Sequence, residues 1–103
     1  MIKFYRTDHK VLSEITEYED NMWVCMTKPT VDETKLIAED FEIDLADVRA
    51  ALDDEESSRV EVEDGYTLIL VDIPSIEMRN EREAYTTIPL GIILVKDILI
   101  TVC

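Results

Sequence analysis

Residues 59–73 read RVEVEDGYTLILVDI, and this stretch decides which class of fold the chain can adopt. Residues 59–63 alternate strictly between charged side chains and valine, which is the two-residue period of a β-strand. Asp64-Gly65 is the preferred two-residue hairpin turn, in which both residues take positive φ. The run from Tyr66 to Ile73 is almost wholly apolar, as expected of a central strand. The stretch therefore predicts a β-hairpin whose second strand lies inside a sheet.

The residues before this hairpin predict two short helices. Thr30 and Glu33 have the spacing of a capping box, and apolar residues follow at helical intervals, which predicts a helix over residues 31–41. Asp44 is a second N-cap residue, with apolar residues at i, i+3 and i+7 after it. A second helix is therefore expected over residues 45–52.

The rest of the chain supplies further strands around these elements. Short alternating or apolar runs predict strands at residues 2–7, 11–17, 22–27, 84–95 and 98–102. The polar stretch IEMRNERE, residues 76–83, is expected to form a loop. Strands, then helices, then strands indicate an α+β fold: a mixed, largely antiparallel sheet with two short helices inserted between strands, on one face. A chain of 103 residues is long enough for one such domain and not for two.

Composition limits the partners that this domain can have. The net charge of -14 excludes nucleic acid and anionic membrane surfaces, and leaves cations and basic protein surfaces as charged partners. Hydrophobic residues make up 47% of the chain, enough for a folded core. No signal peptide or transmembrane span is recognisable, so we expect a soluble chain. Cys25 and Cys103 make no disulfide framework and favour a reducing compartment.

No arrangement of residues points to catalysis. His9 is the only histidine and has no cysteine or histidine at zinc-ligand spacing, which indicates a surface residue in a polar bend. Gly65 and Gly91 are the only glycines, so a phosphate-binding loop is excluded. Among 24 acidic residues, a pair of carboxylates at any given spacing carries no information. We therefore predict that the chain is not an enzyme.

The acidic residues are concentrated between residues 32 and 64, where fourteen of them accompany three basic residues. Four consecutive acids, residues 53–56, follow the C-terminal end of the second predicted helix, where the helix dipole disfavours negative charge. Two interpretations stay open: a solvated acidic face, or a weak, partly hydrated Mg²⁺ surface, since hard cations prefer oxygen ligands. The candidate ligands for such a surface are Asp47, Asp53, Asp54 and Glu55.

The order of these features resembles the cytosolic N-terminal domain of the CorA family of divalent-cation transporters. The resemblance covers about residues 22–102. It consists of a Trp in a strand, a Pro-Thr helix start with an acid, a Phe-x-Ile step, a basic-Val-Glu strand, a Tyr, an apolar strand and a closing strand pair. In this sequence these are Trp23, Pro29-Thr30 with Glu33, Phe41-Glu42-Ile43, Arg59-Val60-Glu61, Tyr66, Leu68 to Val71 and GIILVKDILITV.

The resemblance implies a homopentameric transporter that passes Mg²⁺, and often Co²⁺ or Ni²⁺. It implies that residues 1–103 are a single domain, an N-terminal fragment on the cytoplasmic face of the cell membrane. The membrane is then reached only through C-terminal helices that this sequence lacks, so the fragment alone conducts no ions. The end at Cys103, directly after a core-like strand, fits a fragment. The expected function is regulation and assembly among subunits, with no firmly bound cofactor and with divalent cations, Mg²⁺ above all, as weak ligands.

One departure from the family pattern concerns the second helix. Arg49-Ala50 occupy the positions at which well-known members carry an acidic pair of the regulatory metal site. Either neighbours such as Asp47, Asp53 or Asp54 supply the carboxylates, or this protein does not sense Mg²⁺ in that way. Two functions of other classes also stay open: a free-standing α+β module that binds a small ligand or a basic protein partner, and an enzyme that uses carboxylates.

Overall fold

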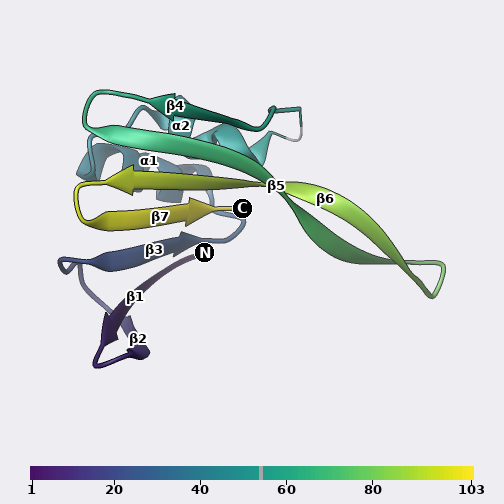
Figure 1. The fold of residues 1–103 in the computed structure, drawn as a ribbon, viewed down its shortest axis with the longest axis horizontal. Helices are drawn as coiled ribbons and strands as arrows, with labels where there is room; N and C mark the ends of the chain where they lie inside the picture. Colours follow the sequence, from purple (N-terminus) through teal and green to yellow (C-terminus); the bar gives the residue numbers. More distant parts are fainter. Residues whose placement is uncertain (54) are drawn as a thin grey trace.

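The computed structural model describes residues 1–53 and 55–103, which form one seven-stranded sheet with helices on one face (Figure 1). The strands are β1 (Ile2–Asp8), β2 (Val11–Ile15), β3 (Met22–Met26), β4 (Arg59–Val62), β5 (Tyr66–Arg79), β6 (Arg82–Val95) and β7 (Ile98–Val102). Their order across the sheet is β2-β1-β3-β7-β6-β5-β4. Only β3 and β7 pair in parallel, and every other neighbouring pair is antiparallel. The expected α+β fold with a mixed, largely antiparallel sheet is confirmed.

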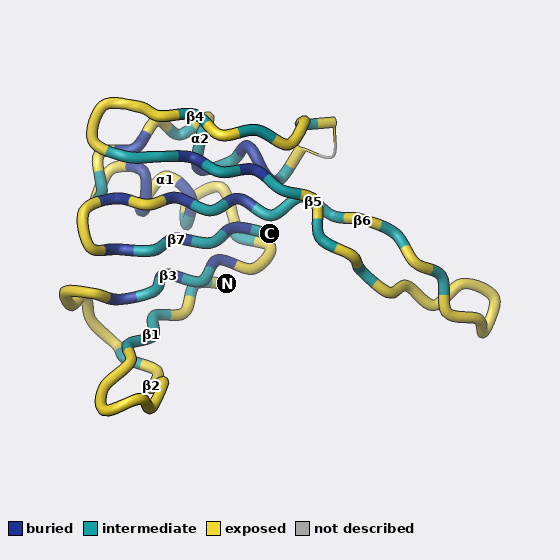
Figure 2. Tube along the Cα trace, viewed as in Figure 1, coloured by how far each residue is buried: buried dark blue, intermediate teal, exposed yellow. Residues whose placement is uncertain are grey.

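The helical layer connects β3 to β4 and covers one face of the sheet. It consists of α1 (Val31–Asp40) and α2 (Leu45–Arg49), which continues as the tight turn η1 (Ala50–Leu52). The core lies between this layer and the helix-facing side chains of the strands (Figure 2). Its buried apolar residues are Met22, Val24, Met26, Ile37, Ala38, Ile43, Val48, Ala50, Ala51, Leu68, Leu70, Ile93, Val95, Ile98, Ile100 and Val102.

Both helices begin where capping residues predicted them to begin. The Thr30 hydroxyl accepts from the Glu33 amide, and the Glu33 carboxylate accepts from the Thr30 amide at 2.9 Å, which completes the capping box. The same carboxylate accepts from the amino group of Met1 at 3.0 Å, and these hydrogen bonds hold the pKa of Glu33 below its usual value. Asp44 caps α2 by accepting from the Ala46 amide.

The pairing of β4 with β5 determines which side of β4 faces the helices. Leu68 and Leu70 of β5 are buried beneath the helical layer, and their direct partners on β4 are Glu61 and Arg59. Because directly opposite residues lie on the same side of a sheet, the charged side of β4 faces α2. The valines of β4 lie on the outer face, where Val62 is 80% exposed. The predicted alternation is confirmed, and it turns the charged side chains inward.

A contact between two small residues allows η1 to lie directly on the sheet. A Cβ atom at Gly91 of β6 would stand only 3.1 Å from the Cβ of Ala51. Such a distance is shorter than ordinary van der Waals contact, so a side chain at Gly91 would push η1 away from β6. The close approach explains why a glycine interrupts an otherwise apolar strand.

The expectation of a loop at residues 76–83 is wrong. β5 continues to Arg79 and β6 begins at Arg82, so both strands extend beyond their neighbours as a two-stranded ribbon (Figure 1). The turn consists of Asn80 and Glu81, both with positive φ, as in the favoured two-residue hairpin turns. The ribbon was missed because charged residues obscure the alternation of Ile76 and Met78 with their neighbours. We call residues 72–89 the arm.

The expected geometry of the Asp64-Gly65 turn is only partly correct. The turn lies between the predicted strands, and the Glu63 amide donates to the Tyr66 carbonyl at 2.9 Å. Gly65 has φ +91, but Asp64 does not have positive φ, whereas the prediction required it at both positions. One left-handed residue at the second position is the pattern that a glycine there provides without strain.

We predict that Gly91→Val destabilises the domain by about 1–3 kcal/mol, because the added side chain overpacks the contact with Ala51. The measurement is the free energy of unfolding in urea. Thr67→Val, a nearly isosteric change on the outer face of the sheet, is the control and should stay within about 0.5 kcal/mol of the parent. Equal stability of the parent and Gly91→Val would show that η1 does not rest on β6 as described.

Candidate metal centre

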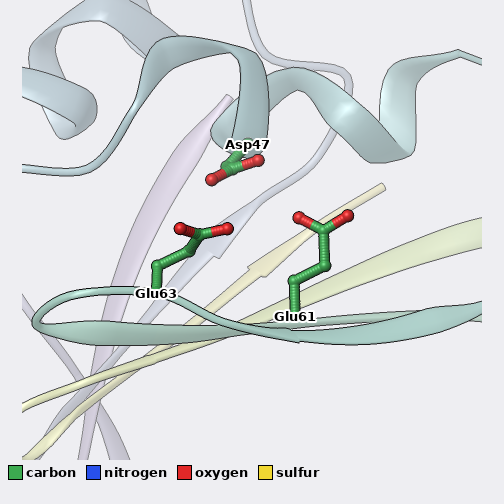
Figure 3. Close-up of side chains that lie close together, drawn as sticks. All are labelled: Asp47, Glu61 and Glu63. Atoms are coloured by element: carbon green, nitrogen blue, oxygen red, sulfur yellow. The ribbon is translucent and has the colours of Figure 1, made fainter.

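Three carboxylates from two elements meet beneath α2 (Figure 3). Asp47 points from α2 toward the sheet, and Glu61 of β4 and Glu63, just after β4, point toward Asp47. One carboxylate oxygen of each lies within 4.8 Å of the others. Asp47 and Glu61 are half-buried, and Glu63 is exposed. Among the described residues this is the one group of three acidic, histidine or cysteine side chains close enough to share a metal ion. We call Asp47, Glu61 and Glu63 the acidic triad.

Tyr66 fixes the position of Asp47. Its hydroxyl donates to the Asp47 carboxylate at 2.5 Å and accepts from the Asp44 amide at 3.3 Å. Burial, and then the hydrogen bond to Asp47, raise the pKa of the Tyr66 hydroxyl to about 12. The tyrosine thus remains a donor throughout the neutral range. Its hydrogen bond orients one oxygen of the Asp47 carboxylate.

Arg59 partly neutralises the acidic triad. Its guanidinium donates to Glu61 and to Glu56, at 2.5 Å each, and these two bonds raise its pKa above the usual value. Asp47 and Glu63 have no cationic partner within the described part of the chain. Two like charges at 4 Å repel by about 4 kcal/mol at an effective dielectric constant of 20. The acidic triad therefore carries more negative charge than Arg59 can balance.

The sequence-predicted metal residues are distributed over two places. Asp47 belongs to the acidic triad. Asp53 and Glu55 are exposed in the bend after η1, where the Asp53 carboxylate accepts from the Glu55 amide at 3.0 Å. Asp54 lies outside the described residues. The structure thus brings Asp47 together with Glu61 and Glu63, and not with Asp53 or Glu55. A cation on any of these residues stays a prediction.

The acids of the bend also have structural contacts. Asp53 closes a local turn through its side chain, which is a common use of aspartate after a helix. Glu56 is paired with Arg59, which joins the bend to β4. These contacts account for two of the four consecutive acids without a cation.

Arg49 and Ala50 have structural roles at the point where the chain departs from the family pattern. The Arg49 guanidinium donates to the hydroxyl of Thr34 at 2.9 Å and so ties α2 to α1. Thr34 is fully buried, and its hydroxyl in turn donates to the Val31 carbonyl. Ala50 is in the core. Neither residue can supply a carboxylate, so any cation beneath α2 depends on the acidic triad.

Sequence reasoning missed Glu61 and Glu63 as candidate ligands. Both stand in the alternating stretch of residues 59–63, whose charged side would normally be expected to face solvent. The signal that could have found them is their i, i+2 spacing, which puts two carboxylates on one side of a strand. That side is next to α2 only because the register of β4 and β5 turns it inward.

The three carboxylates of the acidic triad are oxygen ligands of the kind that hard cations prefer. Mg²⁺ takes oxygen ligands at 2.0–2.1 Å, usually keeps several waters and uses one or two carboxylates. Two oxygen ligands on opposite sides of a Mg²⁺ ion are about 4.2 Å apart. This distance is slightly shorter than the 4.8 Å within which the carboxylate oxygens of the acidic triad lie from one another. A partly hydrated divalent cation therefore fits with small side-chain movements.

Comparison with known proteins assigns a family to this fold. The family described as CorA-like Mg²⁺ transporter protein matches residues 18–103, most of the chain. The chain belongs to this family. The resemblance predicted from residues 22–102 is confirmed. None of the curated proteins compared matches the sequence.

Solved structures share the fold of this CorA-like chain. The soluble domain of CorA from Methanocaldococcus jannaschii has a TM-score of 0.78 and 24% identity, over 99% of this chain and 40% of that one. The complete CorA magnesium transporter of the same organism has a TM-score of 0.74 and 19% identity, over 99% and 32%. The ZntB cytoplasmic domain from Vibrio parahaemolyticus has a TM-score of 0.69 and 18% identity, over 99% and 43%.

The length of this CorA-like chain is a fraction of the length of those proteins. It spans between 32% and 43% of the three matched structures. Within the residues that the structure describes, no helix has both the length and the apolar character to cross a membrane. Two of the three matched structures are themselves described as a soluble or a cytoplasmic domain, and this chain covers less than half of each.

We predict that the contribution of Tyr66 to stability is lost at alkaline pH. Its folded-state pKa, about 12, is above the usual 10, so the stabilisation is complete below pH 10 and disappears as the pH rises toward 12. Tyr66→Phe should cost about 1 kcal/mol at neutral pH, the size of one hydrogen bond. Urea unfolding of both proteins in a pH series measures the difference. A difference that stays constant across this interval would contradict the assigned hydrogen bond.

Proposed function

We propose that this chain is the cytosolic regulatory and assembly domain of a CorA-like divalent-cation transporter, and that the acidic triad binds Mg²⁺ weakly. Three carboxylates that converge beneath α2, with incomplete neutralisation, carry the proposal. In this proposal the domain lies on the cytoplasmic face of the membrane, acts in a homo-oligomer such as a pentamer, and has no catalytic role. Membership of the family supports the transporter over a free-standing module.

Neutralisation is the physical means by which the cation would act. Asp47 belongs to α2, Glu61 belongs to β4 and Glu63 directly follows β4, so their repulsion pushes the helical layer away from the edge of the sheet. A divalent cation between them removes the repulsion and draws α2 toward β4. The position of α2 would then report the cation concentration, since binding and helix position are thermodynamically linked.

Arg59 would act as an internal competitor of the cation. Its bond to Glu61 occupies an oxygen that a metal ion would use, and its charge opposes a second cation nearby. Competition of this kind weakens binding. A sensor that responds to millimolar Mg²⁺ must release the ion again when the concentration falls. Such a sensor needs weak binding of this kind.

We predict that Mg²⁺ raises the melting temperature of the domain more than NaCl does at equal ionic strength. Binding at ten times the dissociation constant stabilises by about 1.4 kcal/mol, which is roughly 5–10 °C for a domain of this size. The double substitution Glu61→Gln and Glu63→Gln should abolish the excess. Asp53→Asn with Glu55→Gln removes the same charge from the bend and should retain it. An equal rise with both salts would show only screening.

Arg59→Gln serves as a second control because it should lower the melting temperature without Mg²⁺ but increase the rise that Mg²⁺ causes. Without Mg²⁺ the variant should melt at a lower temperature than the parent, since the acidic triad loses its neutralising charge. The additional rise with Mg²⁺ should be larger, since the competitor is gone. A smaller Mg²⁺ effect in Arg59→Gln would contradict binding at Glu61.

A further inference from the structure

The arm, residues 72–89, leaves the sheet as a ribbon of two strands. The last register pairs with the neighbouring strands are Arg59 with Leu70 and Val102 with Gly91, so β5 and β6 pair only with each other beyond them in the part of the chain that the structure describes. Figure 2 shows the arm extending away from the helical layer, exposed or half-exposed along its length. Because a two-stranded ribbon is marginally stable in water, a partner that covers one side would stabilise it.

One side of the arm carries large apolar side chains. Ile76 lies directly opposite Tyr85 in the register, and Met78 follows on the same side of β5. Their exposed fractions are 60% for Ile76, 76% for Tyr85 and 67% for Met78. Three large apolar side chains that lie together form a surface to be covered, unlike scattered single ones. We call this the apolar side of the arm.

The charged residues on the apolar side are both acids. Residues 72, 74, 76 and 78 of β5 share this side with their register partners 89, 87, 85 and 83 of β6. Asp72 and Glu83 are the only charged residues of this set. Neither forms an ion pair within the described part of the chain. The apolar side therefore presents hydrophobic side chains next to uncompensated carboxylates.

The arginines of the arm do not offset this negative charge. Arg79 and Arg82 form the last register pair and lie on the opposite side of the ribbon, where Arg79 is paired with Glu77 at 3.0 Å. Residues 72–89 contain four acids against these two arginines, on a chain whose net charge is -14. Charge complementarity therefore favours a basic partner for the arm and disfavours a second acidic copy of the chain or an anionic membrane.

A hollow of about 450 Å³ at the base of the arm offers a place for a basic side chain. It is lined by the carboxylates of Glu56, Asp72 and Glu77 and by the hydroxyls of Thr86 and Thr87, among others. Glu56 and Glu77 are each paired with an arginine, whereas Asp72 has no such pair among the described residues. A lysine or arginine of a partner could reach Asp72 here while its neighbours cover the apolar side.

Prolines and dimensions restrict the form of the partner. Pro74 stands on β5 and Pro89 on β6, and neither has an amide hydrogen to donate to an added strand. Prolines at strand edges disfavour the addition of another strand, so docking on the side of the ribbon is favoured. The ribbon is about 25 Å long, from eight residues per strand, and an α-helix of about 16 residues has the same length. An amphipathic helix therefore matches the apolar side in shape.

We propose that the apolar side of the arm binds a basic amphipathic helix of a partner protein. The apolar face of the helix covers Ile76, Met78 and Tyr85, and its basic side chains meet Glu83 and Asp72. Docking supplies the third layer that the ribbon lacks. This inference goes beyond the proposed function, because it requires neither a bound cation nor a homo-oligomer.

Fluorescence anisotropy with two synthetic peptides tests the proposal, at fixed ionic strength and without divalent cations. The first probe is a labelled helix of about 16 leucines and lysines with the leucines on one face. The matched probe has the same composition in an order that leaves no apolar face. Because the two probes carry equal charge, the 103-residue chain should bind the first at least about tenfold more tightly only if an apolar surface takes part.

Substitutions locate the contact on the arm. Ile76→Ser with Met78→Ser should weaken binding of the amphipathic probe at least about tenfold, because two apolar contacts are lost. Val60→Ser with Val62→Ser is the matched control, since it removes two exposed apolar side chains from β4, and it should bind like the parent. Ala84→Ser, on the opposite side of the arm, should also bind like the parent. Circular dichroism checks that each variant is folded.

The electrostatic part of the contact has its own variant. Glu83→Gln should weaken binding of the amphipathic probe about two- to fivefold, the size expected for an exposed ion pair. Glu14→Gln makes the same change of charge at an exposed acid of β2 and should leave binding unchanged.

Equal affinity for the two probes, or an Ile76→Ser, Met78→Ser variant that binds the amphipathic probe as tightly as the parent, overturns the proposal. Sedimentation equilibrium of the chain without peptide tests the other occupant, and a monomer is expected. Self-association that the same double substitution abolishes would assign the apolar side to a second copy and overturn the proposal as well.

Discussion

The register in which β4 pairs with β5 determines what lies beneath α2. Leu68 and Leu70 must be buried, and the tight turn at Gly65 leaves β4 one way to pair with them. A shift by one residue would put the valines under α2 and the carboxylates into solvent. The acidic triad, the ion pair of Arg59 and the exposed valines on the outer face are therefore three consequences of one register.

The architecture could be predicted because its signals are local. Capping residues such as Thr30 and Asp44 predicted where the helices begin, and the two-residue period predicted most strands. The acidic triad could not be predicted in full, because Asp47 meets Glu61 and Glu63 only through the packing of α2 on the edge strand. The arm escaped prediction for a different reason: its alternation is hidden among charged residues, and its turn at Asn80 contains no glycine.

The consecutive acids of residues 53–56 do not act as one group, because their members make different contacts. Asp53 closes its own turn, and Glu56 pairs with Arg59. The uncompensated charge lies instead at Asp47 and Glu63, which stand far apart in the sequence. The acid-rich part of the sequence therefore contains the candidate site. Which of its acids come together depends on how α2 packs against β4. Arg49, where the family resemblance implies an acid, stabilises the pair of helices.

We propose that a divalent cation binds at the acidic triad and not at the bend. Paramagnetic broadening by Mn²⁺, followed in the amide NMR spectrum of the chain, tests it most directly. We expect the amide signals of Asp47, Glu61 and Glu63 to lose intensity at the lowest Mn²⁺ concentrations, before those of Asp53 and Glu55. Earlier broadening at the bend, or uniform broadening at all exposed acids, would contradict it.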